Sequence, residues 1–407
     1  RNDLAEEPLQ VVLKEGIIDF RVEDIRDKPL DEQQAYIKAL LEADKDEGFD
    51  LSAGPLARLI IVQQSENRFY QIWSNHHLNL DGWSTNAVLY EFDVFYKSLI
   101  SNQSSTLQDV EPYSRYVSWL DDIDYKKSKS YWNKYLTDYE SKAVIPFDNE
   151  DVPQHTGYIP KDYEFWLSEE LSKNLSAIAQ KEKTTLNTIV QSAWGILLSR
   201  YNNTQDVVFG SVVSGRPSEL KGIQEMIGVF INTVPQRIRY TSHMTFIELL
   251  KNTQQSFIFG EPHHHLNLAE IQCESELGTN LIDHLVVFEN YPISGKKNVI
   301  NENSESILIQ STNVKSSKGI VSIEKENEEW FEQINYDFSL MAASEEQLFF
   351  RIKYNRAKYS DRYIKRLEGQ WKNLLEQIAL EPQASISGYE ILTQEEKTYL
   401  LETLNDT

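Results

Sequence analysis

The pattern of hydrophobic and polar residues is clearest near the start of the chain. Aromatic and polar residues alternate over residues 69–75, which predicts a strand, and residues 57–64 predict a second strand that pairs with it across a short polar turn. Over residues 85–100 the apolar positions recur at helical spacing, so a helix is expected there. Another helix is expected over residues 31–45, with Asp31 as its N-cap.

The rest of the chain also divides into helical and extended patterns. Residues 185–201 are apolar almost all round a helix, and residues 207–213 form a continuous apolar strand, so both should be deeply buried. A long amphipathic helix is expected over residues 361–380. Shorter elements are expected as helices at 111–120, 128–139 and 168–181, and as strands at 9–13, 162–167, 227–237, 285–292, 336–340 and 347–354. A chain of 407 residues allows two domains or lobes and buries a sizeable core.

Two stretches show no regular period. Residues 140–160 carry prolines, a glycine and several acids, and we interpret them as the linker between two lobes. Residues 295–329 are polar and rich in Ser, Asn, Lys and Glu, which is typical of a surface excursion.

Composition and charge exclude several classes of protein. Aspartate and glutamate number 63 against 40 lysines and arginines, and the resulting charge of −23 repels nucleic acid and anionic membranes. No apolar run approaches the ~20 residues that span a bilayer. The single cysteine, Cys273, excludes an internal disulfide framework, so we expect a cytoplasmic protein and a buried structural thiol. The chain opens at Arg1 with acidic and polar residues, so no signal peptide is expected, and the missing initiator methionine suggests a piece of something longer.

The residues best suited to catalysis lie between the strand expected at residues 69–75 and the helix expected at residues 85–100. His76 and His77 leave the strand, and Asp81, Gly82 and Ser84 enter the helix. Neutral imidazole has a pKa near ~6.5, so it accepts a proton near neutral pH. Asp81 could orient an imidazole directly or pin the loop through a distant arginine. The Gly82 N–H is a candidate oxyanion donor.

Neither histidine cluster of this chain predicts a metal site. Adjacent side chains on a strand point in opposite directions, so His76 and His77 make a poor pair of ligands, and no HxxxH or CxxC spacing accompanies them. His263, His264 and His265 cannot all face one ion, and we interpret them as polar residues at the surface or at a helix entry.

Two short phrases carry a resemblance to a known family. The run from His76 to Gly82 reads His-His-Leu-Asn-Leu-Asp-Gly and is followed by Trp83 and Ser84. It resembles the His-His-x-x-x-Asp-Gly signature of nonribosomal peptide synthetase condensation domains, in the chloramphenicol-acetyltransferase-like superfamily. Residues 227–233 resemble the family phrase Ile/Val-Gly-x-Phe-x-Asn-Thr, and weaker likenesses extend over nearly the whole chain. The family's usual opening strand, helix and Arg-His-Glu-x-Leu-Arg phrase are not found, which departs from the pattern.

The resemblance implies the fold. Condensation domains are α/β proteins with two chloramphenicol-acetyltransferase-like lobes, a V-shaped pseudo-dimer with a substrate tunnel between the lobes. By this likeness the N-terminal lobe covers residues 1–155 and is incomplete at its start, and the C-terminal lobe covers residues 156–390. Residues 391–407 resemble the linker toward a following adenylation domain.

The resemblance also implies roles for individual residues. The second histidine of the signature carries catalysis in the family and corresponds to His77, while His76 and Gly82 support the motif. Asp81 is expected to pair with an arginine, which by its spacing is Arg216. The residues expected along the substrate tunnel by the same likeness are Trp83, Ser84, Gly228, Phe230, Asn232 and Asn290. No metal is expected, and no cofactor on the domain itself.

The function implied by the resemblance is peptide bond formation in antibiotic biosynthesis. A donor aminoacyl or peptidyl thioester meets the amine of an acceptor aminoacyl thioester, and both are carried on the phosphopantetheine arms of carrier proteins. The implied partners are the upstream and downstream peptidyl carrier proteins and an adjoining adenylation domain, with no nucleic acid and no membrane. Two alternatives stay open: a stand-alone acyltransferase that uses a soluble thioester, and a non-catalytic recruitment module of the same fold. It also stays open whether His77 removes a proton from the amine or positions it.

Overall fold

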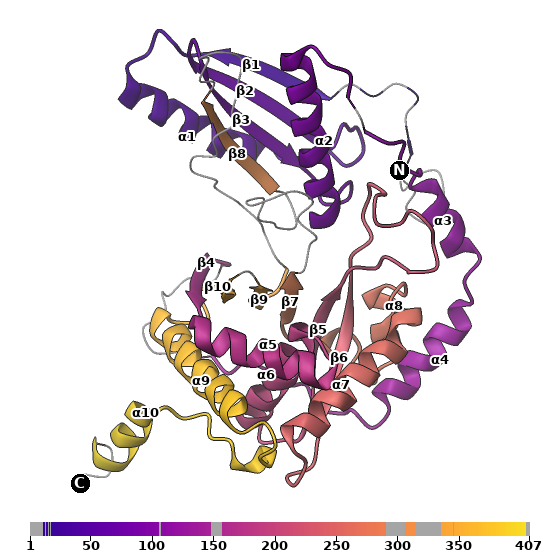
Figure 1. Cartoon of the computed structure of the whole chain (residues 1–407), viewed down its shortest axis with the longest axis vertical. Helices are drawn as coiled ribbons and strands as arrows, with labels where there is room; N and C mark the ends of the chain where they lie inside the picture. The colour runs from indigo at the N-terminus through magenta and orange to yellow at the C-terminus, as the bar shows by residue number, and fades with distance from the viewer. Residues whose placement is uncertain are drawn as a thin grey trace. The chain divides into compact units, whose positions relative to one another are not determined.

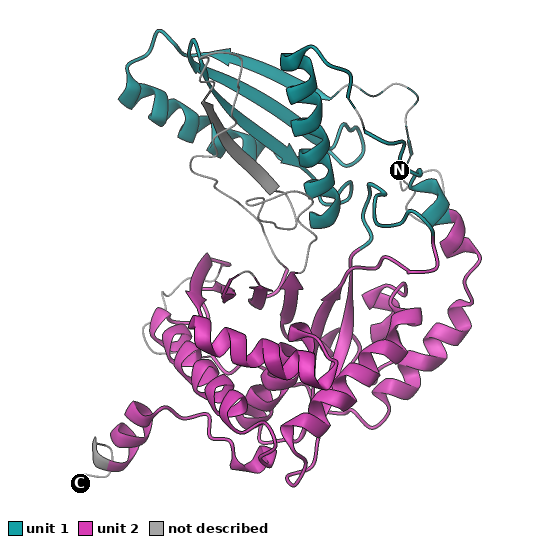
Figure 2. Ribbon diagram, viewed as in Figure 1, with its two compact units in different colours: residues 1–117, 221–230, 293–334 teal, residues 118–220, 231–292, 335–407 magenta. Residues whose placement is uncertain are grey.

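The computed structural model (Figure 1) describes residues 11–403 except for 13, 15, 17, 106, 148–156, 290–305, 314–334 and 345. The chain divides into two compact units (Figure 2). The first comprises residues 1–117, 221–230 and 293–334, and the second comprises residues 118–220, 231–292 and 335–407. The chain thus enters each unit more than once, and the lobe boundaries 1–155 and 156–390 that the resemblance implies stay predictions.

A four-stranded sheet in the order β1-β2-β3-β8 forms the centre of the first unit. Strands β2 (Ala57–Ser65) and β3 (Arg68–Asn75) form the antiparallel hairpin that the alternation predicts. Strand β1 (Asp19–Asp24) runs parallel to β2, and β8 (Ser306–Asn313) runs antiparallel to β3. The sequence pattern predicts neither of these two strands. Strand β8 lies within residues 295–329, which the sequence indicates as a surface excursion, and the other residues of that stretch lie outside the described part of the chain. Most of the strand expected at residues 9–13 falls outside the described residues.

Each face of this sheet packs against one helix (Figure 1). Neighbouring side chains of a strand point to opposite faces. Ile60 therefore packs against α1 (Leu30–Glu47), whereas Leu59 packs against α2 (Gly82–Ser101). Helix α1 begins one residue before Asp31, which lies in its first turn and is not the N-cap that the sequence predicts.

A six-stranded mixed sheet in the order β4-β10-β9-β7-β5-β6 forms the centre of the second unit. Strands β9, β7 and β5 run parallel to one another, and the remaining three pair antiparallel with their neighbours. The strands are β4 (Pro160–Trp166), β5 (Asp206–Val213), β6 (Asn232–Arg239), β7 (Leu285–Glu289), β9 (Phe338–Ser344) and β10 (Leu348–Asn355).

Helix α6 (Leu186–Asn202) is the most deeply buried helix of the second unit, as its apolar sequence predicts. A Cβ at Gly195 would lie 2.5 Å from the side chain of Ile238, so a glycine is needed where α6 meets β6. Phe209 of β5 shares a core with α6, while its neighbour Val208 faces a second core formed with α4 (Tyr125–Leu136). The other helices are α3 (Ser114–Asp121), α5 (Glu169–Glu182), α7 (Phe246–Gly260), α8 (Leu268–Cys273), α9 (Asp361–Leu380) and α10 (Gln394–Thr398), with short turns η1 (Glu261–His263), η2 (Gly278–Asn280), η3 (Ile386–Gly388) and η4 (Tyr399–Thr403).

The expected linker at residues 140–160 begins as part of the second unit. The indole N–H of Trp132 in α4 donates to the carbonyl of His263 at 3.1 Å, and the N–H of Ile145 donates to Asp283 at 3.1 Å. Residues 118–147 are therefore fixed within the second unit, and residues 148–156 lie outside the described part of the chain. In the described ranges, no helix has the length and apolar character that a bilayer-spanning segment needs.

Candidate active site

The histidine pair leaves strand β3 through a tight turn. The backbone N–H of His76 donates to the carbonyl of Leu56 at 2.9 Å, which extends the β2–β3 ladder past Asn75. The carbonyl of His76 then accepts the N–H of Asn79 at 3.0 Å, and its ring Nδ1 accepts the N–H of Leu78 at 3.1 Å. Because an acceptor nitrogen carries no proton, this hydrogen bond selects the His76 tautomer whose ring proton lies on Nε2.

The side chain of His77 is half-buried. With the residues that the structure describes, its imidazole makes no hydrogen bond and no ion pair. Both ring nitrogens are therefore available for an external proton donor or acceptor.

Asp81 fixes the end of the turn. It is almost fully buried, and one carboxylate oxygen accepts the N–H of Ser84 at 2.8 Å, so it is the N-cap of α2. The other oxygen accepts the N–H of Phe230 at 3.0 Å, and the Asp81 N–H donates to the carbonyl of Gly228 at 3.3 Å. The helix entrance predicted from the sequence is thus confirmed, with Gly82 buried as the first residue of α2.

Ser84 and Gly228 form a second link between the two halves of the site. The Ser84 hydroxyl donates to the carbonyl of Gly228 at 2.7 Å and accepts the N–H of Gly228 at 3.1 Å. The indole of Trp83 donates to the carbonyl of Gln224 at 2.8 Å. The structure therefore brings the histidine motif and residues 227–230 of the second motif together within the first unit, while their expected positions along a substrate tunnel stay predictions.

Tyr113 belongs to this site, whereas the sequence predicts it only as part of the helix expected at residues 111–120. Its ring lies against Gly228, where a Cβ would be 2.1 Å from the ring atom Cδ2, and its hydroxyl donates to the carbonyl of Val229 at 2.7 Å. Phe230 packs its ring against Tyr113 and Tyr116, at 5.1 and 4.7 Å between ring centroids. The aromatic spacing of residues 113–119 predicts side chains in the core of a helix. In the sequence, the glycine at position 228 is the signal that another side chain approaches the backbone closely there.

The remaining expected site residues belong to the second unit or lie outside the described residues. Asn232 lies in the second unit, where both of its amide hydrogens bond to carbonyls, of His264 at 2.7 Å and of Leu266 at 2.6 Å. Arg216 is buried in the loop after β5 of the second unit, and its pairing with Asp81 stays a prediction. Asn290 lies outside the described residues.

The three consecutive histidines are buried or half-buried, so the surface alternative of their interpretation is wrong, and they lie shortly before the start of α8. The hydroxyl of Ser128 bridges His263 Nδ1 at 2.9 Å and His265 Nε2 at 3.1 Å, while the ring of His264 stacks on Trp132. Burial lowers the pKa of all three histidines, to about 4 for His264. They are therefore neutral packing groups near pH 7.

The described part of the chain contains no group of three or more His, Cys, Asp or Glu residues that could hold a metal ion. Cys273 is exposed at the end of α8, which corrects the expectation of a buried thiol.

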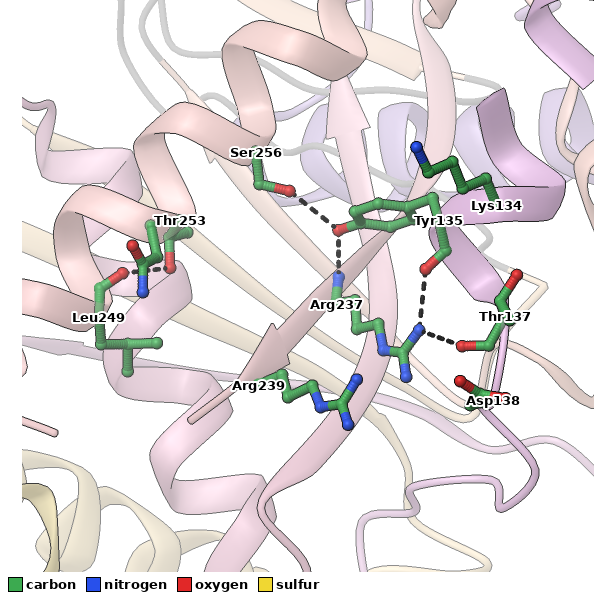
Figure 3. A pocket seen from close by; sticks show the side chains of 10 residues that line it. Lys134, Tyr135, Thr137, Asp138, Arg237, Arg239, Leu249, Thr253 and Ser256 are labelled. Atoms are coloured by element: carbon green, nitrogen blue, oxygen red, sulfur yellow. Dashed lines mark hydrogen bonds between the residues drawn. The ribbon is translucent and has the colours of Figure 1, made fainter. Parts of the chain in front are cut away.

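A pocket of about 520 Å³ lies in the second unit (Figure 3). Its lining residues fall between Lys134 and Ser256, so none belongs to the histidine turn. Its central guanidinium, that of Arg237, makes a two-point ion pair with Asp206. The same guanidinium donates to the carbonyls of Tyr135 and Thr137 (Figure 3). The hydroxyl of Tyr135 in turn accepts the N–H of Arg237 at 2.8 Å. These groups hold the end of α4 to β6, so the pocket contains internal structural bonds rather than a base beside a nucleophile.

The whole chain matches a known family. The family model described as the condensation domain matches residues 1–401. The chain is 35% identical over 406 residues to gramicidin S synthase 2 of Brevibacillus brevis, and 35% identical over 402 residues to bacitracin synthase 3 of Bacillus licheniformis. These matches cover 100% and 99% of this chain but 9% and 6% of the relatives, so the chain spans a small part of each.

Solved structures show the same fold at low sequence identity. A four-domain nonribosomal peptide synthetase, holo-AB3403 bound to AMP and glycine, matches with a TM-score of 0.71 at 17% identity, over 94% of this chain and 29% of that one. The starter condensation domain of rhizomide synthetase RzmA matches with a TM-score of 0.67 at 16% identity, over 93% of this chain and 82% of that one. The X-domain complexed with OxyB from teicoplanin biosynthesis matches with a TM-score of 0.68 at 16% identity, over 93% of this chain and 80% of that one.

These matches confirm the mixed α/β, two-lobe, chloramphenicol-acetyltransferase-like fold that the resemblance implies. With the histidine signature at the end of β3 and the family match over residues 1–401, the chain belongs to the condensation-domain family of nonribosomal peptide synthetases, acyltransferases that form amide bonds.

Proposed function

We propose that this domain joins a donor aminoacyl or peptidyl thioester to the amine of an acceptor aminoacyl thioester, with His77 serving the reacting amine. The acceptor nitrogen attacks the thioester carbonyl, the carbon–sulfur bond breaks, and the proton lost by nitrogen ends on the departing thiol. The imidazole of His77 either carries that proton or orients the amine. Both substrates are tethered on phosphopantetheine arms of carrier proteins, so neither requires a cofactor bound to this domain.

One observation supports His77 above all others: its imidazole is free of internal hydrogen bonds among the described residues, while the turn that carries it is fixed at both ends. Before it, His76 is bonded to Leu56, and after it, Asp81 is bonded to Ser84 and Phe230. A fixed base contributes about 10²–10⁴-fold to a proton transfer. Holding two tethered reactants together can contribute ~7–11 kcal/mol more.

The test uses donor and acceptor carrier proteins loaded with their thioesters, and intact-protein mass spectrometry to follow the mass gained by the acceptor. His77→Ala should fold normally and give no condensation product above background. Leu78→Ala is the matched control, because Leu78 lies in the same turn with an exposed side chain. A wild-type rate in His77→Ala would refute the assignment.

The partners proposed are the two carrier proteins and an adenylation domain. The relatives matched over this chain are peptide synthetases, and the AB3403 structure has four domains. We also expect the domain to work in the reducing cytosol, which suits a single cysteine.

A recruitment module is the second candidate, because the X-domain in its complex with OxyB matches this fold as well as a condensation domain does. Fold alone therefore does not separate the two functions. Carrier-dependent turnover separates them, since a recruitment module gives none. Turnover with a soluble coenzyme A thioester in place of the donor carrier protein would instead favour a stand-alone acyltransferase.

A further inference from the structure

A buried arginine lies beside the strand that ends at the histidine turn. Arg58 of β2 pairs across the ladder with Ser74 of β3, and the side chain of Arg58 is only 6% exposed. Its guanidinium bonds to Asp44 at 2.5 Å and to Asp19 at 2.9 Å. The second oxygen of Asp44 accepts the Ser74 hydroxyl. A guanidinium held by this many partners has one fixed position.

Phe49 connects this fixed cation to the signature. The guanidinium carbon of Arg58 lies 5.3 Å from the centre of the Phe49 ring, within the range of a cation–π contact. The same ring meets the imidazole of His76 edge to face, with 6.4 Å between centroids and an angle of 89° between planes. Phe49 thus contacts the fixed cation on one side and the first histidine on the other.

The contacts of His76 leave little freedom for the next residue. Its ring is bounded by Phe49 and bonded through Nδ1 to Leu78, and its backbone is bonded to Leu56. Since His76 and His77 share a peptide bond, the position of His76 sets the direction in which the chain leaves β3 at His77.

We propose that Phe49 is a positioning residue for the condensation reaction, holding His76 against Arg58 so that the turn presents His77 in one place. This inference rests on the proposed function of His77. A packing role alone is a weaker explanation, because Phe49 is only half-buried and its ring contacts join two polar groups. A displacement of about 1 Å at a reacting group can cost 10²-fold in rate, so a loosened turn is expected to be slow.

The experiment compares Phe49→Leu with Phe49→Tyr in the carrier-protein assay. Leucine keeps an apolar side chain but removes the ring, and tyrosine keeps the ring. Phe49→Leu should lower kcat by roughly tenfold or more with KM for the acceptor carrier unchanged, and Phe49→Tyr should keep the wild-type kcat. Phe95→Leu, at an exposed phenylalanine of α2, is the matched control and should change neither constant. The melting temperature of each variant shows whether the domain remains folded.

A spectroscopic measurement gives an answer that does not depend on turnover. With ¹⁵N-labelled histidine, the ring nitrogens of His76 should show the Nε2-protonated tautomer in the wild type, assigned by the loss of its signals in His76→Gln. Phe49→Leu should mix the two tautomers, and Phe49→Tyr should not.

Three results would overturn the inference. Wild-type kcat and an unchanged His76 tautomer in Phe49→Leu, together with an inactive His77→Ala, would reject the role of Phe49 and leave the proposed function standing. If Phe49→Leu lowers only the melting temperature and leaves kcat and the His76 tautomer unchanged, the role of Phe49 is purely structural. An active His77→Ala would overturn both proposals.

Discussion

The carboxylate of Asp81 accepts the backbone N–H of Phe230, 149 positions along the chain, at 3.0 Å. Its other oxygen caps helix α2 through the N–H of Ser84. One buried side chain therefore joins the end of the histidine turn, the start of a helix and a segment that arrives from the middle of the chain. The His-His-x-x-x-Asp-Gly run and the Ile-Gly-x-Phe phrase are two parts of one structural unit.

Asp81→Ala should destabilise the first unit strongly. The change removes an N-cap, worth about 0.5–2 kcal/mol, and a charge-assisted bond to a buried N–H, worth about 1.5–3 kcal/mol. We expect a loss of roughly 2–5 kcal/mol in the free energy of unfolding, measured by urea denaturation. Asp31→Ala is the matched control, because Asp31 lies in the first turn of α1 with an exposed side chain and makes no cap hydrogen bond. Equal stability of Asp81→Ala and wild type would show that the carboxylate does not hold this unit together.

Gly228→Ala should also destabilise the first unit, by steric conflict. The new Cβ would lie 2.1 Å from Cδ2 of Tyr113, and that ring is tied through its hydroxyl to the carbonyl of Val229. Overpacking of this kind costs about 1–3 kcal/mol or more. Gly388→Ala is the control, since a Cβ there meets nothing within 4 Å.

A double-mutant cycle isolates that contact. Tyr113→Ala removes the ring that the new methyl group meets, so Gly228→Ala should cost less stability in the Tyr113→Ala background than in the wild type. If Gly228→Ala costs the same with and without the Tyr113 ring, the steric explanation is wrong.

The sequence predicts the local part of this site well and the long-range part poorly. The strand exit at Asn75 and the helix entrance at Asp81 follow from alternation, helical spacing and cap chemistry, all of which act within a few residues. The turns at residues 221–231 cannot be predicted in this way. An apolar run predicts a strand in either case, whether its backbone bonds to a neighbouring strand or to side chains such as those of Asp81 and Ser84.

Two further errors have the same physical cause. Strand β8 is stabilised by pairing with β3, more than two hundred positions earlier, and three apolar residues in a polar stretch were too weak a signal of it. The polar residue type of His263 to His265 predicts exposure to solvent. Their burial depends on the aromatic rings of α4 and α7, which only the tertiary fold brings to them.

Asn232→Ala should lower stability through the loop that it holds. The amide of Asn232 donates to the carbonyls of His264 and Leu266, and its loss leaves two acceptors without that donor. We expect a cost of roughly 1–3 kcal/mol in the free energy of unfolding. Asn252→Ala, at an exposed asparagine of α7, should stay within about 0.5 kcal/mol of wild type. A destabilised second unit would show a structural role, whereas unchanged stability with a raised KM would favour the substrate role that the resemblance implies.

The stability of the second unit should fall in mild acid because of His264. Burial, together with the smaller effects of His263 and His265 beside it, lowers the pKa of His264 from 6.5 to about 4. Between pH 6.5 and about pH 4, the imidazole of His264 is therefore protonated in the unfolded chain but not in the folded chain. The contribution of His264 to the free energy of unfolding is fully present above pH 6.5. It is lost as the pH falls toward 4, by up to about 3 kcal/mol.

His264→Phe tests this dependence, since phenylalanine keeps a ring for the stack on Trp132 and does not titrate. Urea denaturation at a series of pH values between 7 and 4 should give a shallower loss of stability for the variant than for the wild type. His243→Phe, at an exposed histidine, should leave the slope unchanged. The remaining slope in His264→Phe is expected to come from His263, His265 and His284, whose pKa values burial also lowers. If wild type and His264→Phe lose stability in parallel over this range, His264 is not the group that takes up the proton on unfolding.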